Sequence, residues 1–281
     1  MTETGRNMNA IITLTTDFGL TDAYVAAMKG VILGINPKAN IIDICHAIAP
    51  QNISQAAFVL NTAYKFFPER TVHVVVVDPG VGTGRRAIIL RTPQFDFIAP
   101  DNGVLSYVIE PFLKQWPGPE QGQVTLPPEL KAVSITKPEF WRTPVSPTFH
   151  GRDIFAPIAA RLSLGASPET FGEVMNSVTV LPETRPHQES ADTLLGRIVH
   201  IDNFGNLITN FKHEDLPQKP FAVEVSNRSI SGLSRTYAEG EELLALIGSS
   251  GYLEIAVKGG SALDFLGVAV GGEVRIKLGK R

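Results

Sequence analysis

Apolar residues in the first two thirds of the chain alternate between short continuous runs and longer stretches with helical spacing. Short apolar runs predict buried strands, and apolar residues three or four positions apart predict helices. The predicted strands are 10–15, 41–45, 71–77, 87–90 and a run from Phe97, and the predicted helices are 22–33, 54–66, 104–109 and 154–162. Strands that alternate with helices in this way predict an α/β domain with a mostly parallel central sheet and helices on both of its faces.

The pattern changes after residue 182. Residues 183–192 are polar and contain a proline, and the chain beyond them shows short alternating strands with turn signals and little helical spacing. The predicted strands of this part are 195–201, 221–225, 243–247, 252–257 and 272–278. We therefore expect an α/β domain at 1–182, a linker at 183–192 and a smaller all-β domain at 193–281, built as an antiparallel barrel or sandwich. Within the first domain, the Pro/Gly/Gln-rich stretch 114–128 predicts an exposed insertion.

Composition narrows the classes of function. The chain has 281 residues, a formal net charge of -3 and one cysteine, and its lysines and arginines are spread along the sequence. We therefore expect a small-molecule substrate, with no nucleic acid and no membrane as partners. Cys45 alone cannot form an internal disulfide, which favours a cytoplasmic location. The first nine residues lack the apolar core of a signal peptide, Met8 is a candidate start, and no apolar run is long enough to span a bilayer.

The end of the third predicted strand carries the most distinctive chemistry. The apolar run 74–77 leads into Asp78, a glycine-rich turn, Arg85 and Arg86. A strand that is apolar on both faces is covered on both sides, and ligands in such sheets bind beyond the carboxyl ends of the strands. Asp78 is therefore a candidate site residue. Arg85 can reach it across the loop, either within a site or as an ion pair that stabilises the turn. The turn lacks the Gly-Lys-Ser/Thr ending of a nucleotide-triphosphate loop.

Two further stretches combine polar side chains with turn signals. His150 follows a proline-rich approach and lies near the start of the predicted helix 154–162, where it can act as a base, a ligand or a surface residue. A metal site is not expected, because the six histidines show no closely spaced pair and the single cysteine adds no ligand. The stretch 202–210 places one aspartate and three asparagines around a turn. It forms ordinary Asx turns or clamps a zwitterion, since a carboxylate accepts from an ammonium and an amide can serve either charged group.

Several motifs together carry a resemblance to a known family. They are LTTDFG (14–19), MKG (28–30), DICH (43–46), VDPGVG (77–82) with Arg85 and Arg86, APDNGVL (99–105), TFHGRD (148–153), DNFGN (202–206) and SSGYLE (249–254). In this order, over nearly the whole chain, they resemble the S-adenosyl-L-methionine hydroxide adenosyltransferase family, whose members hydrolyse S-adenosylmethionine to adenosine and methionine and are related to the fluorinase and chlorinase. The resemblance implies a homotrimer in which the β-rich domain completes the active site of a neighbouring subunit. It implies no cofactor and no metal.

The resemblance also assigns the reacting end of the site. The family's catalytic Asp, Arg and His match Asp78, Arg85 and His150, and its ribose-binding carboxylate matches Asp17. A sulfonium leaves as a neutral thioether, so the reaction needs a placed nucleophile and no general acid. We expect Asp78 to accept a hydrogen bond from water as that water attacks the ribose 5′ carbon in line, while Arg85 and His150 position the oxygen. A carboxylate with an ordinary pKa of about 4 cannot form hydroxide beforehand.

In the β-rich domain, the resemblance assigns residues to the amino-acid and adenine ends of the substrate. Asp202 and Asn206 match the methionine-binding pair, although they are one residue closer in sequence than in the halogenases. Ser249 matches the serine that meets the methionine carboxylate. Tyr237 matches the aromatic residue beside adenine, and the backbone near Val257 matches the segment that reads the adenine edge.

Two alternatives to hydrolysis stay open. Halide transfer in the same fold is disfavoured because Asp78 places a negative charge beside the halide position, and because Gly151 lacks the serine hydroxyl that the fluorinase has there. A non-catalytic adenosine or S-adenosylmethionine binding protein would use Asp17 and Tyr237 to hold the nucleoside, while Asp78 and the residues around it only stabilise a loop.

Overall fold

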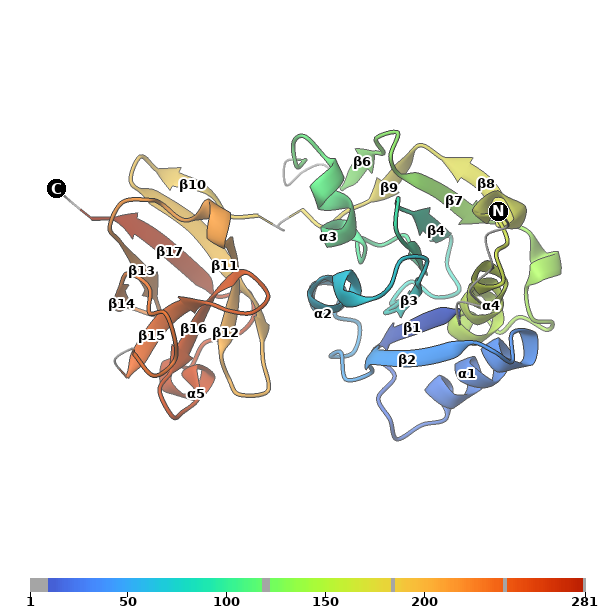
Figure 1. The fold of residues 1–281 in the computed structure, drawn as a ribbon, viewed down its shortest axis with the longest axis horizontal. Coiled ribbons are helices and arrows are strands. Elements are labelled where there is room, and N and C mark those ends of the chain that lie inside the picture. Colours follow the sequence, from blue (N-terminus) through green and yellow to red (C-terminus); the bar gives the residue numbers. More distant parts are fainter. Residues whose placement is uncertain (1–9, 118–121, 183–184, 240–241, 280–281) are drawn as a thin grey trace, which may run out of the picture. The chain divides into compact units, whose positions relative to one another are not determined.

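The computed structural model of the chain describes residues 10–117, 122–182, 185–239 and 242–279 (Figure 1). The chain divides into two compact units, Met1–Pro182 and Glu183–Arg281. The candidate start at Met8 lies outside the described residues, as do residues 183–184 of the stretch expected as a linker. Later in that stretch, His187–Ser190 form strand β10, which pairs with the following strand. This part of the stretch is therefore a strand of the second unit.

The first unit is built on a seven-stranded sheet with the order β2-β1-β3-β5-β4-β7-β8 (Figure 1). The strands are β1 (Ile11–Thr16), β2 (Asn40–Cys45), β3 (Val72–Val76), β4 (Ala87–Arg91), β5 (Asp96–Pro100), β7 (Lys131–Ile135) and β8 (Gly172–Met175). Pairs β2-β1, β1-β3 and β3-β5 are parallel, whereas β5-β4, β4-β7 and β7-β8 are antiparallel. The α/β fold with a parallel core is confirmed, and an antiparallel half extends it on one side.

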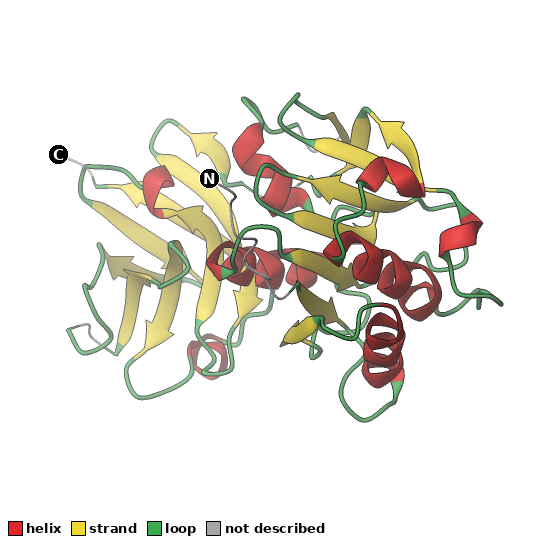
Figure 2. Ribbon diagram, turned by 45° about the vertical axis from the view of Figure 1, so that its right-hand side comes forward, coloured by secondary structure: helices red, strands yellow, loops and turns green. Residues whose placement is uncertain are grey.

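Helices cover both faces of this sheet, as predicted. The helices are α1 (Tyr24–Ile35), α2 (Ile53–Ala63), α3 (Ser106–Ile109) and α4 (Ala156–Ser163), with 3-10 turns η1 (Tyr64–Phe66), η2 (Glu110–Phe112), η3 (Pro138–Phe140) and η5 (Pro168–Phe171). Alternate residues of β3 show the two faces. Val74 and Val76 belong to the apolar core that α1 and α4 share. The side chain of His73, on the opposite face, is buried against Tyr64 of η1. Figure 2 shows these helices arranged around the sheet.

The stretch 114–128 is more structured than an exposed insertion. Residues 118–121 lie outside the described residues, but Gln123–Thr125 form strand β6, which pairs antiparallel with β9 (Ser177–Thr179). Val124 at its centre is buried. The run of prolines and glycines on either side hid this short strand from the sequence pattern.

The second unit is an antiparallel, nearly closed barrel. Its strands are β10 (His187–Ser190), β11 (Thr193–Ile201), β12 (Leu207–Lys212), β13 (Phe221–Val225), β14 (Arg228–Ser231), β15 (Leu243–Ile247), β16 (Tyr252–Val257) and β17 (Glu273–Leu278), with the 3-10 turn η6 (His213–Asp215) and the short helix α5 (Ala262–Leu266). The order is β14-β13-β17-β11-β12-β16-β15, and β10 pairs with β11. Beyond the end of β14, Ser234 donates its N–H to Ala245 of β15 at 2.8 Å, which brings the two edges together. No described helix is both long and apolar enough to cross a membrane.

Candidate active site

A pocket of about 370 Å³ lies at the carboxyl ends of β1 and β3. Asp17 and Asp78, which follow those two strands, line it together with His150. Parallel strands end at the same edge of a sheet, and this edge is where α/β proteins bind ligands. Phe18, Tyr24 and Phe149 form one wall, with ring centroids 5.1–5.8 Å apart. The pocket therefore joins carboxylates, an imidazole and apolar aromatic surface.

The predicted Asp, Arg and His come together at this pocket. Arg85 donates from Nε to Asp78 Oδ1 at 2.9 Å and from Nη2 to Asp78 Oδ2. The same Nη2 lies 2.8 Å from His150 Nδ1. The side chains of Asp78 and Arg85 are only 6% and 12% exposed. Arg85 thus stands behind the other two side chains and holds both of them at the pocket wall.

The contact with Arg85 determines which nitrogen of His150 carries the hydrogen. A guanidinium has five N–H donors and no acceptor, so Nδ1 of His150 must accept. The imidazole is then neutral, with its hydrogen on Nε2. Burial, followed by the positive charge of Arg85, lowers the pKa of His150, which favours this neutral form. His150 can therefore donate a hydrogen bond from Nε2 to an oxygen atom in the pocket.

Two backbone features bring His150 to the glycine-rich turn after β3. Gly82 has a φ of +76°, and a Cβ there would lie 2.4 Å from the carbonyl oxygen of Pro147, so the turn packs directly against the segment before His150. His150 itself precedes a π-helical turn, Gly151–Phe155, that leads into α4. The predicted helix at 154–162 is therefore confirmed with a wider first turn, of a kind frequent at functional sites.

Asp17 sits on a tight turn after β1. Its Oδ2 accepts the N–H of Gln51 at 2.8 Å. Gln51 has a φ of +64°, which is unusual for a residue other than glycine, and it lies in the connection between β2 and α2. Because Gln51 carries no sequence signal for this role, the contact could not be predicted.

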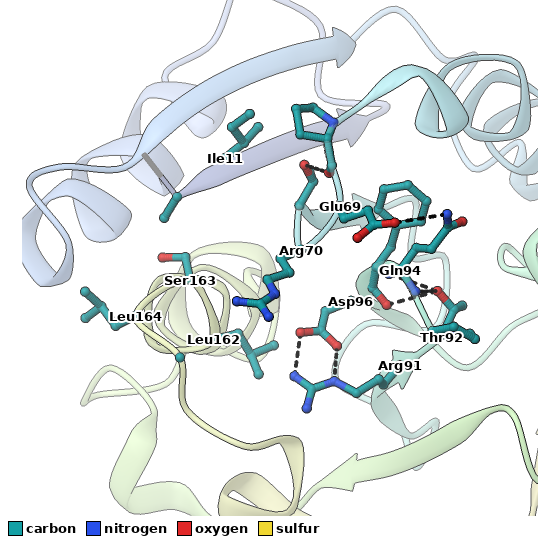
Figure 3. A pocket seen from close by; sticks show the side chains of 16 residues that line it. Ile11, Glu69, Arg70, Arg91, Thr92, Gln94, Asp96, Leu162, Ser163 and Leu164 are labelled. Carbon is teal, nitrogen blue, oxygen red and sulfur yellow. Dashed lines mark hydrogen bonds and ion pairs between the residues drawn. The ribbon is translucent and has the colours of Figure 1, made fainter. Parts of the chain in front are cut away.

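A second cavity, of about 730 Å³, lies at the opposite edge of the sheet, around the start of β1 and the end of α4 (Figure 3). Its buried carboxylate, Asp96, is already bound by Arg91 through two hydrogen bonds of 2.7 Å. None of the predicted site residues lines this cavity. The larger cavity is therefore not the candidate active site, because the predicted site residues Asp17, Asp78 and His150 line the smaller pocket.

In the second unit, Asp202 and Asn206 form one closed turn between β11 and β12. Asp202 Oδ1 accepts the backbone N–H groups of Phe204 and Asn206, both at 2.9 Å, and Oδ2 accepts from the Asn206 side chain at 3.0 Å. Gly205 between them has a φ of +81°, and a Cβ there would collide with Ser261. The turn is an Asx turn, and its carboxylate is held in one orientation.

A buried carboxylate that was not predicted as a site residue lies close to this turn. Glu254 on β16 is 7% exposed and accepts a hydrogen bond from the Tyr237 hydroxyl at 2.5 Å. Burial raises the pKa of Glu254, and the negative charge of Asp202 raises it further. Burial, with the hydrogen bond to Glu254, also raises the pKa of Tyr237 to about 12. A single charged residue in the apolar strand Tyr252–Val257 was the available signal.

The remaining predicted positions are surface and strand-end residues. Ser249 is exposed in the turn between β15 and β16, and Val257 ends β16, where its carbonyl accepts the N–H of Gly260 at 3.2 Å. Among the described residues, no three His, Cys, Asp or Glu side chains gather in a way that could hold a metal ion.

Comparison with known proteins gives consistent matches over both units. The model of the SAM hydroxide adenosyltransferase N-terminal domain matches residues 12–172, and that of the C-terminal domain matches residues 196–275. An (R)-S-adenosyl-L-methionine hydrolase of Salinispora tropica is 36% identical, covering 95% of this chain and 98% of that protein. One of Thermus thermophilus is 37% identical over 92% of this chain and 96% of that protein.

More distant and structural matches agree. A fluorinase of Nocardia brasiliensis is 28% identical over 96% of this chain and 97% of that protein. A crystal structure of an uncharacterized conserved protein from Thermotoga maritima is 36% identical, with a TM-score of 0.82, and covers 95% of this chain and 99% of that one.

Proposed function

Because the chain belongs to the SAM hydroxide adenosyltransferase family, we propose that it hydrolyses S-adenosyl-L-methionine to adenosine and L-methionine. The observation that carries the proposal is the contact of Arg85 with both Asp78 and His150 at the wall of the pocket. Full-length relatives named (R)-S-adenosyl-L-methionine hydrolase, 36% and 37% identical, support the substrate.

The mechanism follows from the donors and acceptors of these side chains. The Asp78 carboxylate, which Arg85 holds in place, accepts a hydrogen bond from a water molecule, while His150 Nε2–H donates to the oxygen of the same water. The water is thereby aimed at the ribose 5′ carbon, opposite the sulfonium. As the new C–O bond forms and the C–S bond breaks, the water proton passes towards Asp78, methionine leaves as a neutral thioether, and the carbon inverts. Placement in line with the leaving group is the main contribution to rate.

Water is favoured over a halide by the hydrogen-bonding capacity of Asp78. Arg85 balances the charge of this carboxylate, which is only 6% exposed, but the carboxylate can only accept hydrogen bonds. A halide next to it would therefore lose its hydration without gaining a donor, whereas water can donate to it. The identity to hydrolases is also higher than the 28% identity to the fluorinases of Nocardia brasiliensis and Actinoplanes. Halide transfer remains the second candidate function because it uses the same fold and substrate.

Incubation of the purified protein with S-adenosylmethionine tests the proposal. We expect adenosine and methionine in equal amounts by chromatography, and no 5′-chloro-5′-deoxyadenosine when chloride is in excess. A chlorinated product would establish the halide alternative. Binding of adenosine without any turnover would instead show a non-catalytic binding protein.

We further propose that the complete site combines two subunits of a homotrimer. Asp78 and its partners belong to the first unit, whereas Asp202 and Asn206, proposed to bind methionine, belong to the second. D78N and D202N proteins, each first measured alone to establish that it is inactive, are mixed after dissociation and reassembly to test this arrangement. If each site takes one unit from each of two neighbours, random mixing restores roughly a quarter of wild-type activity. If each site lies within one subunit, no activity returns.

A further inference from the structure

The turn that carries Asp17 is held by a buried histidine outside the Asp, Arg and His of the pocket. His46 follows β2 and is 5% exposed. Its Nδ1 lies 2.8 Å from the hydroxyl of Thr16, the last residue of β1, and its carbonyl accepts the N–H of Gly19 at 2.8 Å. Thr16 Oγ1 also accepts the N–H of Phe18 at 3.3 Å. One residue therefore binds the turn on both sides of Asp17.

His46 is itself held from the other side of its ring. Nε2 lies 3.0 Å from Asp43 Oδ1, although the ring N–H is not aimed straight at that oxygen, and Lys29 Nζ donates to Asp43 Oδ2 at 2.6 Å. These contacts outweigh the effect of burial and lower the pKa of Asp43, so that carboxylate stays charged. The chain Lys29, Asp43, His46 and Thr16 thus runs from the surface of α1 to the edge of the pocket.

Asp17 depends on this turn because it has little support of its own. Its described contact is with the N–H of Gln51, on the same β2–α2 connection that carries His46. Three contacts from that connection, His46 Nδ1, His46 O and Gln51 N–H, therefore determine where the Asp17 carboxylate points into the pocket. Thr16 is completely buried and does not line the pocket, so it can act on a ligand only through the turn.

We propose that His46, through Thr16, is a positioning residue that orients Asp17 towards the ribose hydroxyl groups of the substrate. The inference rests on the proposed function for the identity of the substrate. It goes beyond that function because it assigns ribose recognition to a hydrogen-bonded chain outside the pocket. Loss of one such hydrogen bond weakens an interaction by about 0.5–1.5 kcal/mol, which is roughly a 2- to 12-fold change in affinity.

Calorimetric titration with adenosine tests the proposal independently of turnover. Thr16→Val keeps the size of the side chain and removes the hydroxyl, so we expect adenosine to bind about 2- to 12-fold more weakly. Thr16→Ser should bind as the wild type does. 2′,3′-Dideoxyadenosine lacks the hydroxyl groups that Asp17 would bind, so wild type and T16V should have the same affinity for it. In turnover of S-adenosylmethionine, T16V should raise KM and leave kcat nearly unchanged.

The two amide replacements of His46 provide the matched pair. His46→Asn places an amide near the Nδ1 position and should keep the contact with Thr16, whereas His46→Gln reaches the Nε2 position and should behave like T16V. Equal weakening of adenosine and dideoxyadenosine by T16V, or identical behaviour of H46N and H46Q, would overturn the proposal. If wild-type protein binds adenosine but does not hydrolyse S-adenosylmethionine, the proposed function fails while the positioning role is still tested.

Discussion

Replacing Asp78 by asparagine isolates the charge of the proposed water-binding residue, because the two side chains have nearly the same size. The amide oxygen can still accept from Arg85 Nε, as Asp78 Oδ1 does at 2.9 Å. The amide nitrogen cannot accept from Nη2, so one charge-assisted hydrogen bond is lost and Arg85 is left without its counter-charge. A hydrogen bond to a charged group contributes about 1.5–3 kcal/mol, and breaking a fully buried ion pair costs about 3–5 kcal/mol.

Because asparagine keeps one of the two hydrogen bonds to Arg85, the expected loss of stability is below that of a fully broken ion pair, about 2–3 kcal/mol. For a unit of this size such a loss lowers Tm by about 4–12 °C. We expect kcat to fall by about 100- to 10,000-fold, because the attacking water loses the charged acceptor that takes its proton. Calorimetry measures Tm, and chromatography of adenosine measures kcat at a temperature where the variant is folded.

Asp101→Asn is the matched control. Asp101 is also buried and accepts two hydrogen bonds from one arginine, Arg86, but it does not line the pocket. We expect D101N to lower Tm by a similar amount and to keep kcat close to wild type. Turnover by folded D78N within a few-fold of wild type, or an equal loss of kcat in D101N, would refute the reasoning.

Three further predictions concern other parts of the first unit. Burial and the charge of Arg85 lower the pKa of His150, and Arg85 can donate only to its unprotonated Nδ1. We therefore expect kcat/KM to fall only at pH values on the acid side of the ordinary histidine range, and Arg85→Gln to shift this fall to higher pH. An NMR titration in which Arg85→Gln leaves the pKa of His150 unchanged would contradict this. Burial lowers the pKa of His73 to about 3. Below its ordinary pKa of about 6.5, the unfolded chain therefore takes up a proton that the folded chain excludes. Between about pH 7.5 and pH 5, the free energy of unfolding of the wild type, measured with urea, should fall by about 2 kcal/mol more than that of His73→Gln. Gly82→Ala should lower Tm and kcat together, because the new Cβ would lie 2.4 Å from the Pro147 carbonyl oxygen at a φ of +76°; an alanine variant with wild-type kcat would show that contact between this turn and the His150 segment is not needed.

The sequence predicted the parts of the site that follow from strand order. A run of valines that ends in an aspartate places Asp78 at the sheet edge, and the glycine-rich turn brings Arg85 back to it. The antiparallel half of the sheet was not predicted as such. β4 and β5 were predicted as strands, and the four residues between them are too few for the crossover that a parallel pair needs. β7 and β8 were not predicted, and β8 has only four residues (Gly172–Met175) in which to show a pattern.

Contacts that depend on register and on loop conformation could not be predicted. Thr16 meets His46 because β1 and β2 pair in parallel with a shift in register before Thr15, which opposes Cys45. The left-handed φ of Gln51 is likewise a result of the folded connection. Glu254 was a missed signal of another kind, because a single carboxylate in an apolar strand points to a buried polar partner, here Tyr237.

Hydrolysis of S-adenosylmethionine in water enriched in oxygen-18 tests the central claim most directly, because it reports which carbon the water attacks. If Asp78 and His150 aim water at the ribose 5′ carbon, adenosine carries one labelled oxygen, in its 5′-hydroxyl, and methionine carries none. Unlabelled adenosine, or the appearance of 5′-methylthioadenosine with labelled homoserine, would contradict the account.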